Sequence, residues 1–168
     1  MYDVFDEKLI AVAAQRGIKH VPVLIADTAQ QAKGFCLART TDQWVFKAGV
    51  AALVDLEKDS RRDSLHHRSS GLDTTSAGLC ARHGTLVAIN LSSLRTLDPI
   101  LIGRVQQNIE LCRQHHVQMC VLSIAKSEAE LPHEQDVRSL LISLGMSPGE
   151  AKSATDAFGA AYERFGTK

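Results

Sequence analysis

Residues 72–91, LDTTSAGLCARHGTLVAINL, hold the pattern that decides the fold. The first part, residues 72–83, is typical of a helix, and Gly84 can adopt the left-handed conformation that commonly follows a helix end. The second part, residues 86–91, is apolar on both faces, as expected of a strand buried between two layers. The order of helix, glycine and buried strand therefore predicts one unit of an α/β fold.

The same order occurs twice more along the chain. Further strands are expected at residues 21–26, 50–54 and 117–123, and a shorter one at residues 35–38. The N-terminal unit is expected to begin with a helix in which Asp3 is the N-cap, and Asp6 and Glu7 place negative charge near its first turn.

Buried strands that alternate with amphipathic helices favour a parallel sheet covered by helices and joined by right-handed crossovers. A complete eight-stranded barrel usually needs about 250 residues, and this chain has 168. We therefore expect an α/β fold of TIM-barrel-like parallel βα units that form an incomplete barrel. Two helices are expected near the end of the chain, and the polar residues 57–70 are expected to be a loop within a single domain of residues 1–168.

Charge and composition exclude several classes of protein. The chain has 19 Lys and Arg and 19 Asp and Glu, which excludes a strongly basic arm and an acidic tail. Residues 58–113 are locally basic, with eight Lys and Arg against five Asp and Glu. No apolar run reaches the roughly 20 residues that cross a bilayer, and the N-terminus does not look like a signal peptide, so we expect a cytoplasmic protein. The four cysteines lack the spacing of a zinc site and are expected in the core.

In parallel α/β folds, ligands bind beyond the carboxyl ends of the strands. The polar residues that follow the expected strands are Asp27, Asp55, Asn90, Ser92, Ser93, Ser123 and Lys126. Hydrogen bonding in loops and helix caps is the simplest role for them. An enzyme could instead use Lys126 to form a Schiff base, or Asp27 and Asp55 with a histidine to hold a metal. The sequence has no phosphate-binding loop, nucleophile elbow or dinucleotide-binding glycine motif.

The helix expected over residues 100–116 has two polar residues at or beyond the margin of its apolar face. Arg104 and Asn108 lie one turn apart there. A buried Asn needs a hydrogen-bond partner, most simply the backbone of a neighbouring loop, whereas the Arg104 guanidinium is expected to be free for a phosphate or carboxylate. An ordinary amphipathic helix with an incidental polar pair is the alternative.

Six short motifs follow one another over about residues 45–155. They are Arg68-Ser-Ser-Gly71-Leu72-Asp73, Ala-Ile-Asn90-Leu-Ser-Ser-Leu94, Arg104-x-x-x-Asn108-x-x-Leu111-Cys112, Val-Leu-Ser123-Ile-Ala125, Asp136-Val-Arg138, and Leu144-Gly145-Met146 with Ala151-Lys152. In this order and spacing the chain resembles ribonuclease P protein component 3, the TIM-barrel-like p30 subunit of archaeal and eukaryotic ribonuclease P. The resemblance implies motif positions at Gly71, Asn90, Asn108, Ser123 and Asp136.

The resemblance implies a role in the ribonucleoprotein that removes the 5′ leader from precursor tRNA, whose catalytic part is RNA. The isolated chain would be non-catalytic and would bind no cofactor or metal itself, while Mg²⁺ serves the RNA of the holoenzyme. The implied partners are the ribonuclease P RNA, ribonuclease P protein component 2 and, indirectly, precursor tRNA, with no membrane. The family is expected to form a hetero-oligomer with two copies of each of these two protein subunits.

The locally basic part of the chain supplies candidate RNA-binding residues for this role. They are Arg61, Arg62, Arg68, Arg95, Arg104 and Lys126. Guanidinium groups can bind phosphates through two hydrogen bonds, and several weak contacts together favour RNA through counterion release. We expect shape and phosphate contacts to dominate, with little reading of bases.

The chain departs from the family pattern at three places. Relatives usually have a further strand and helix at the N-terminus. Glu134 and Gln135 stand where a Pro-Arg pair is common before Asp136, and Ser92 stands where an Arg is common. The last two departures remove positive charge from the expected RNA side.

Two other functions fit parts of the sequence. A metal-dependent phosphoesterase related to the polymerase and histidinol phosphatase superfamily would use His20, Asp27, Asp55 and His66. A protein-only interaction module would bind component 2 through an exposed helix and would not touch RNA. Bound zinc, manganese or iron would favour the enzyme, and salt-dependent RNA binding would argue against the protein-only module.

Overall fold

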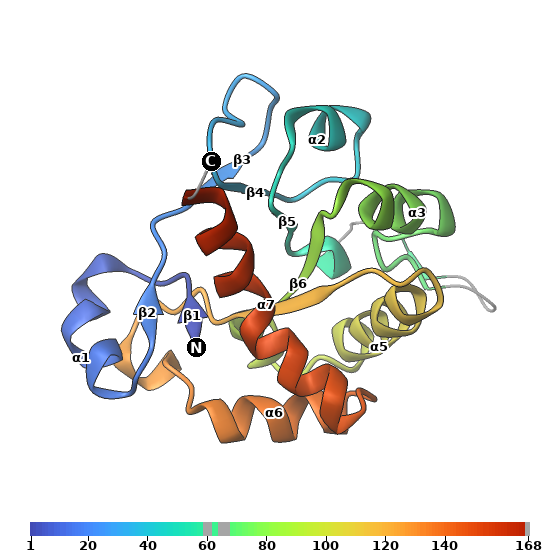
Figure 1. The fold of residues 1–168 in the computed structure, drawn as a ribbon. Helices are drawn as coiled ribbons and strands as arrows, with labels where there is room; N and C mark the ends of the chain where they lie inside the picture. Colours follow the sequence, from blue (N-terminus) through green and yellow to red (C-terminus); the bar gives the residue numbers. More distant parts are fainter. Residues whose placement is uncertain (59–61, 64–67, 167–168) are drawn as a thin grey trace.

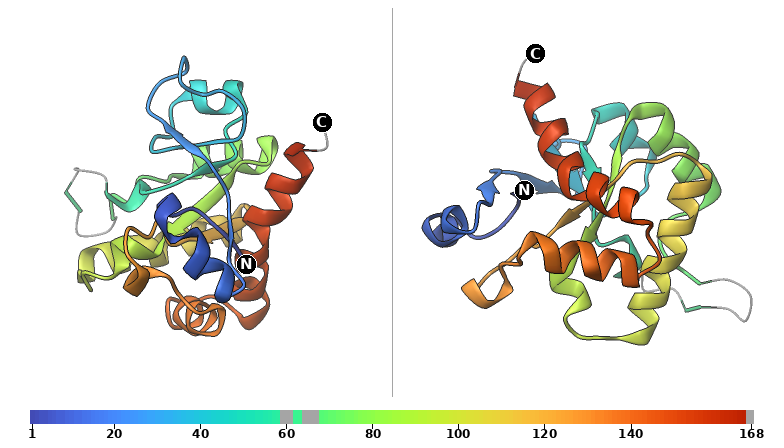
Figure 2. Two further views of the ribbon diagram at one scale, coloured as in Figure 1. Left: turned by 90° about the vertical axis from the view of Figure 1, so that its left-hand side faces the viewer. Right: turned by 60° about the horizontal axis from the view of Figure 1, so that its bottom comes forward.

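The computed structural model describes residues 1–58, 62–63 and 68–166, which form an α/β fold (Figures 1 and 2). Its centre is a parallel sheet in which five strands lie in the order β3-β4-β5-β6-β7. These strands are β3 (Leu24–Ala26), β4 (Cys36–Ala38), β5 (Ala52–Leu53), β6 (Leu86–Asn90) and β7 (Met119–Leu122). The predicted parallel sheet is confirmed, and its spatial order follows the order of the strands in the sequence.

A two-stranded parallel pair joins the two edges of this sheet. β1 (Tyr2–Asp3) pairs with β2 (Lys19–His20), and the chain then leads from β2 directly into the edge strand β3. At the other edge, Phe5 forms a parallel bridge with Ala125, just after β7. The backbone pairing therefore curls the strands into an irregular barrel with fewer strands than a complete TIM barrel. The predicted TIM-barrel-like, incomplete fold is confirmed.

Helices follow most strands and cover the outside of the sheet (Figure 1). They are η1 (Glu7–Leu9), α1 (Ile10–Gln15), α2 (Gln43–Ala48), η2 (Leu56–Lys58), α3 (Thr74–His83), α4 (Leu91–Leu94), α5 (Pro99–Gln114), η3 (Glu128–Glu130), α6 (Glu134–Ser143) and α7 (Pro148–Gly166). Asp73 and Ser76 form a capping box at the start of α3, and Gly84 ends α3 in the left-handed conformation. The unit predicted from residues 72–91 thus forms as expected.

The N-terminal segment differs from the prediction. Asp3 lies in β1 and is buried, because its segment completes the barrel beside the end of β7. The helical cap is Asp6, whose side chain accepts a hydrogen bond from the backbone of Lys8 at 3.0 Å. The strand expected over residues 21–26 is also shorter and less buried than predicted. Its Leu24 is exposed because β3 is an edge strand of the five-stranded sheet.

Strand side chains alternate between an inner and an outer apolar cluster. Leu86 and Ala88 of β6 belong to the cluster inside the barrel, whereas Val87 and Ile89 pack against the surrounding helices. The four cysteines are free and buried, as predicted. None of the described helices is long and apolar enough to cross a membrane.

α7 crosses the end of the barrel at which the strands begin (Figure 1). Its Phe158 joins the inner cluster and packs against Phe35, the residue before β4, with ring centroids 5.3 Å apart. Gly159 lies so close to the ring of Tyr2 that an added Cβ would overlap it. Because α7 covers this end, we expect a functional site at the opposite end, where the strands finish.

Candidate functional site

Polar side chains from neighbouring strands meet at the carboxyl ends of β5 and β6. Asp55 follows β5 with its backbone in the left-handed region, at a φ of 59°. Its Oδ1 accepts hydrogen bonds from Asn90 Nδ2 at 2.7 Å and from Ser93 Oγ at 3.1 Å. Asn90 also caps α4, because its Oδ1 accepts a hydrogen bond from the backbone of Ser92 at 3.0 Å. Asp55, Asn90 and Ser93 therefore form a buried hydrogen-bonded cluster.

Two cations complete the surroundings of Asp55. Lys58 Nζ lies 2.8 Å from Oδ1, and Arg39 Nε lies 3.2 Å from Oδ2. Burial alone would raise the pKa of Asp55, but the hydrogen bonds from Lys58 and Asn90 outweigh burial and lower the pKa below its ordinary value. Arg39 was not among the predicted site residues, although it directly follows β4 and so occupies the same kind of position as Asp55.

A second polar cluster lies where β1 and β7 end. Ser123 N donates to Asp3 Oδ1 at 2.7 Å, and Ser92 Oγ donates to the Ser123 carbonyl oxygen at 2.7 Å. Burial raises the pKa of Asp3 to about 6, against the opposing effect of its hydrogen bonds with Ser123. Asp3 Oδ2 has no hydrogen-bond partner in the part of the chain that the structure describes. Ser123 therefore connects the ends of two strands and a helix.

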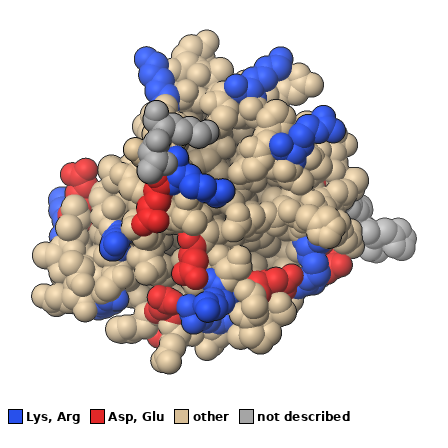
Figure 3. All heavy atoms as spheres, in the orientation of Figure 1, with Lys and Arg blue, Asp and Glu red and all other residues tan. Residues whose placement is uncertain are grey.

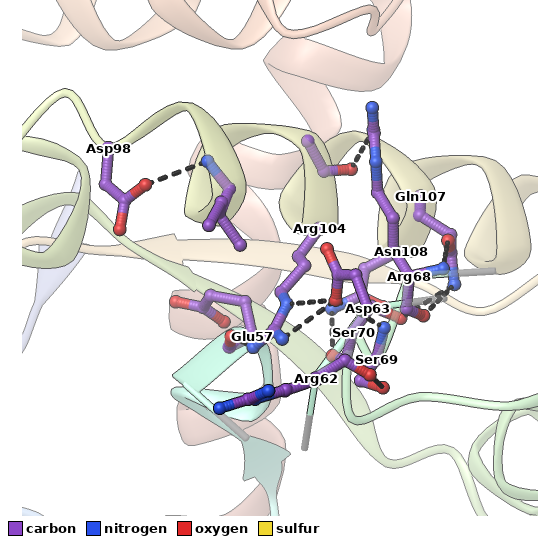
Figure 4. A network of polar contacts seen from close by, with 12 residues as sticks. Glu57, Arg62, Asp63, Arg68, Ser69, Ser70, Asp98, Arg104, Gln107 and Asn108 are labelled. Carbon is purple, nitrogen blue, oxygen red and sulfur yellow. Dashed lines mark hydrogen bonds and ion pairs between the residues drawn. The ribbon is translucent and has the colours of Figure 1, made fainter. Parts of the chain in front are cut away.

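Arg104 is buried in contacts with the segment that follows β5 (Figure 4). Its Nε and Nη2 lie 2.9 and 2.8 Å from Asp63 Oδ1, and its Nη1 donates to the Glu57 carbonyl oxygen at 2.9 Å. The guanidinium in turn lowers the pKa of Asp63. Of the two partners predicted for the Arg104 guanidinium, a phosphate or a carboxylate, the folded chain supplies a carboxylate, that of Asp63. A contact between Arg104 and RNA stays a prediction.

Asn108 and Gln107 hold the next part of the same segment against α5 (Figure 4). Asn108 Nδ2 donates to the Ser70 carbonyl oxygen at 3.0 Å, which confirms the predicted bond to a loop backbone. Gln107 was missed by sequence reasoning, yet it pairs with the backbone of Arg68, accepting from N at 3.2 Å and donating to O at 3.0 Å. Gly71 has a φ of 77°, and an added Cβ would overlap the carbonyl oxygen of Leu56, so the turn requires glycine.

The remaining predicted RNA-binding residues lie on the surface, except that Arg61 is outside the described residues. Arg62, Arg95 and Lys126 are exposed. Arg68 is exposed too, although its Nη1 donates to the Gly103 carbonyl oxygen at 2.8 Å. Arg95 is anchored more weakly, through a 3.3 Å hydrogen bond to the Ala129 carbonyl oxygen. Their role in RNA binding stays a prediction.

The residues suggested for a metal site have other surroundings. His20 packs against the Phe5 ring, and its Nε2 lies 3.1 Å from the Phe5 carbonyl oxygen. Asp27 is exposed after β3, and Asp55 is bonded to two cations. His66 lies outside the described residues. Within residues 1–58, 62–63 and 68–166, no group of three or more His, Cys, Asp and Glu is placed to hold a metal. Asp136 is exposed in the first turn of α6, where its charge favours the helix dipole.

Comparison with known proteins adds two relatives in sequence. No family model matches the chain. Proteins named ribonuclease P protein component 3 from Thermococcus kodakarensis and Thermococcus gammatolerans are 31% identical over 93 residues and 32% identical over 94 residues. The chain is similar to ribonuclease P protein component 3. The matches cover 52% and 54% of this chain, but the chain spans only 41% and 44% of the length of the two component 3 proteins.

Solved structures are similar to the whole fold. A chain in the cryo-EM structure of archaeal ribonuclease P with mature tRNA has a TM-score of 0.64 and 18% identity, covering 98% of this chain and 78% of that chain. The crystal structure of an amidohydrolase has a TM-score of 0.50 and 19% identity, covering 95% of this chain and 36% of that chain. At these identities the structures support the barrel-like fold, while the similarity to component 3 rests on the sequence.

Proposed function

We propose that this chain is a protein subunit of ribonuclease P, the ribonucleoprotein that removes the 5′ leader from precursor tRNA. The observation that carries the proposal is the sequence similarity to two component 3 proteins. The likeness in fold to a chain of archaeal ribonuclease P supports it over nearly the full length. In this role the chain supports the catalytic RNA and does not itself cleave the substrate.

The geometry around α5 supports such a role. Arg104, Gln107 and Asn108 bind the backbone or side chains of the segment that follows η2. This segment carries Arg62 and Arg68, which are both exposed. Anchoring reduces the conformational entropy that exposed cations lose when they contact a phosphate backbone. The segment is therefore suited to present positive charge to RNA.

The proposed partners are the ribonuclease P RNA and ribonuclease P protein component 2, with precursor tRNA contacted only through the complex. Mg²⁺ would act at the RNA of the holoenzyme. A metal-dependent phosphoesterase is the less favoured function, because Asp55, its central candidate ligand, already binds two side-chain cations and two neutral hydrogen-bond donors.

Co-purification from the native cell tests this proposal. The full chain carries an affinity tag at its natural expression level, bound RNA is sequenced, and bound proteins are identified by mass spectrometry. We expect the ribonuclease P RNA and component 2 to be enriched over an untagged control. If neither the ribonuclease P RNA nor component 2 is enriched, the proposal is contradicted. If component 2 alone is enriched when no nuclease is used, so that bound RNA would survive, the protein-only module is favoured.

A further inference from the structure

The buried carboxylate of Asp55 binds two partly exposed cations at the carboxyl end of the barrel. The side chain of Asp55 is 4% exposed, whereas those of Arg39 and Lys58 are 49% and 46% exposed. The charged group of each cation is thus held by Asp55, while about half of each side chain stays exposed to solvent. This pair follows β4 and β5, in line with the position of ligand sites in barrel folds.

The cluster has an excess of positive charge and of hydrogen-bond donors. Arg39 and Lys58 share the carboxylate of Asp55, which leaves one net positive charge on these three side chains. The neighbouring buried Glu57 carboxyl, whose pKa is raised chiefly by burial, adds negative charge only in its ionised form. Arg39 uses Nε for Asp55, and its Nη1 and Nη2 have no partner in the described part of the chain. Lys58 uses one of its three ammonium hydrogens for Asp55. An anion that approached from solvent would therefore find several donors already directed by their common anchor.

The anchor itself is held rigidly. Asp55 Oδ1 accepts from Asn90 Nδ2 and Ser93 Oγ, which are both buried. The backbone of Lys58 adds a further constraint, because its N donates to the Asp55 carbonyl oxygen at 3.1 Å. A surface lysine usually loses side-chain entropy when it binds a ligand. Because Lys58 is already held by Asp55, less entropy remains to be lost on binding.

We propose that Arg39 and Lys58 form a binding site for a phosphate group of an RNA backbone, with Asp55 as the residue that positions them. Arginine matches phosphate oxygens with its planar pair of donors, and lysine adds a compact charge. The half-exposed position suits a group on a long polyanion, whose many weak contacts add up. The inference rests on the proposed function, since it names a contact between this chain and the ribonuclease P RNA.

Salt-dependent RNA binding tests the site. The full chain and its variants are titrated with ribonuclease P RNA between about 50 and 200 mM salt, and log K is plotted against log salt concentration. We expect Arg39→Gln with Lys58→Gln to weaken binding and to lower the magnitude of the slope by about 0.7–0.9, the value for one phosphate contact. Lys47→Gln with Lys152→Gln, two exposed lysines on α2 and α7, removes the same charge elsewhere and should leave the slope nearly unchanged.

Asp55→Asn separates positioning from charge. It makes the protein more positive by one charge, so non-specific attraction alone would strengthen RNA binding. We expect weaker binding instead, because both cations lose their common anchor. Circular dichroism spectra at the assay temperature show that each variant compared is folded.

The outcomes distinguish this inference from the proposed function. If the wild-type chain binds RNA but the Arg39 and Lys58 double variant behaves like the Lys47 and Lys152 control, the phosphate site is wrong and the proposed function stands. Tighter binding by a folded Asp55→Asn variant would overturn the positioning role. No salt-dependent binding by the wild type would overturn both the proposed RNA-binding role and the site.

Discussion

Asn108 shows how a single residue of α5 holds the segment that follows η2. Its Nδ2 donates to the Ser70 carbonyl oxygen at 3.0 Å, and both residues are buried. We expect Asn108→Ala to lower the free energy of unfolding by about 1–3 kcal/mol, because it leaves a buried carbonyl without its donor. Urea denaturation measures the change. Gln106→Ala, at an exposed position of the same helix, should change it by less than about 0.5 kcal/mol, and equal effects would contradict the account.

The same helix shows what the sequence can and cannot predict at a site. Periodicity places Asn108 at the margin of an apolar face, and hydrogen-bond satisfaction then predicts a backbone partner. The partner of Arg104 is Asp63, which lies in a polar stretch with no periodicity to indicate its path. Arg39 escaped prediction for a related reason, because only the strand register brings it to Asp55. Lys58 lies three residues after Asp55 and reaches it through a local turn.

The raised pKa of Asp3 should make the free energy of unfolding depend on pH. Its pKa of about 6 in the folded chain exceeds the ordinary value of 3.8, so the folded state binds this proton more tightly than the unfolded state. The resulting stabilisation is complete below about pH 4 and is lost as the pH rises through about 6. We therefore expect the unfolding free energy of the wild type to fall, relative to Asp3→Asn, by up to about 3 kcal/mol over that range.

Urea denaturation of both proteins at a series of pH values measures this difference. Other carboxylates, such as Asp55, titrate in both proteins and largely cancel in the comparison. Two curves that stay parallel from about pH 4 to about pH 7 would show that burial of Asp3 does not perturb its titration.

At the scale of elements, α7 stabilises the end of the barrel opposite the candidate site. Phe158 is fully buried in the inner cluster, so Phe158→Ala is expected to lower the free energy of unfolding by about 3–5 kcal/mol. Phe165→Ala provides a control on the last turn of the same helix, where the side chain is 46% exposed, and it should cost less than half as much. Thermal and chemical denaturation measure both, and a larger cost for Phe165→Ala would contradict the assigned packing.

The strands also differ in how well the sequence predicts their positions. β6 matches its predicted strand closely because residues 86–90 are buried on both faces and lie between two other strands. The segment around β2 and β3 is divided between two pairings, with β1 and with β4, so no single run of apolar residues records its path. The position of Asp3 in β1 was missed because this two-residue strand depends on pairing with β2 and on a hydrogen bond from Ser123, which follows β7 and lies 120 residues later in the chain.

At the scale of the whole molecule, the balance of charge hides local differences. On the face that carries α7, acidic and basic side chains are mixed (Figure 3). Arg113, for example, is held by Glu110 and Glu150 near the start of α7. At the carboxyl end of the barrel, by contrast, Arg39 and Lys58 share one carboxylate. A zero net charge is therefore compatible with RNA binding at one end of the barrel. That residues 1–168 form a single domain stays a prediction.

In the role that we propose, this chain assists an RNA catalyst. The most direct test is cleavage of precursor tRNA by ribonuclease P RNA and component 2, with and without the full chain, over a series of Mg²⁺ concentrations. We predict that the chain alone cleaves nothing and that its addition lowers the Mg²⁺ concentration needed for half-maximal rate, since its cations offset phosphate repulsion in the RNA. An unchanged rate and an unchanged Mg²⁺ dependence would contradict the account.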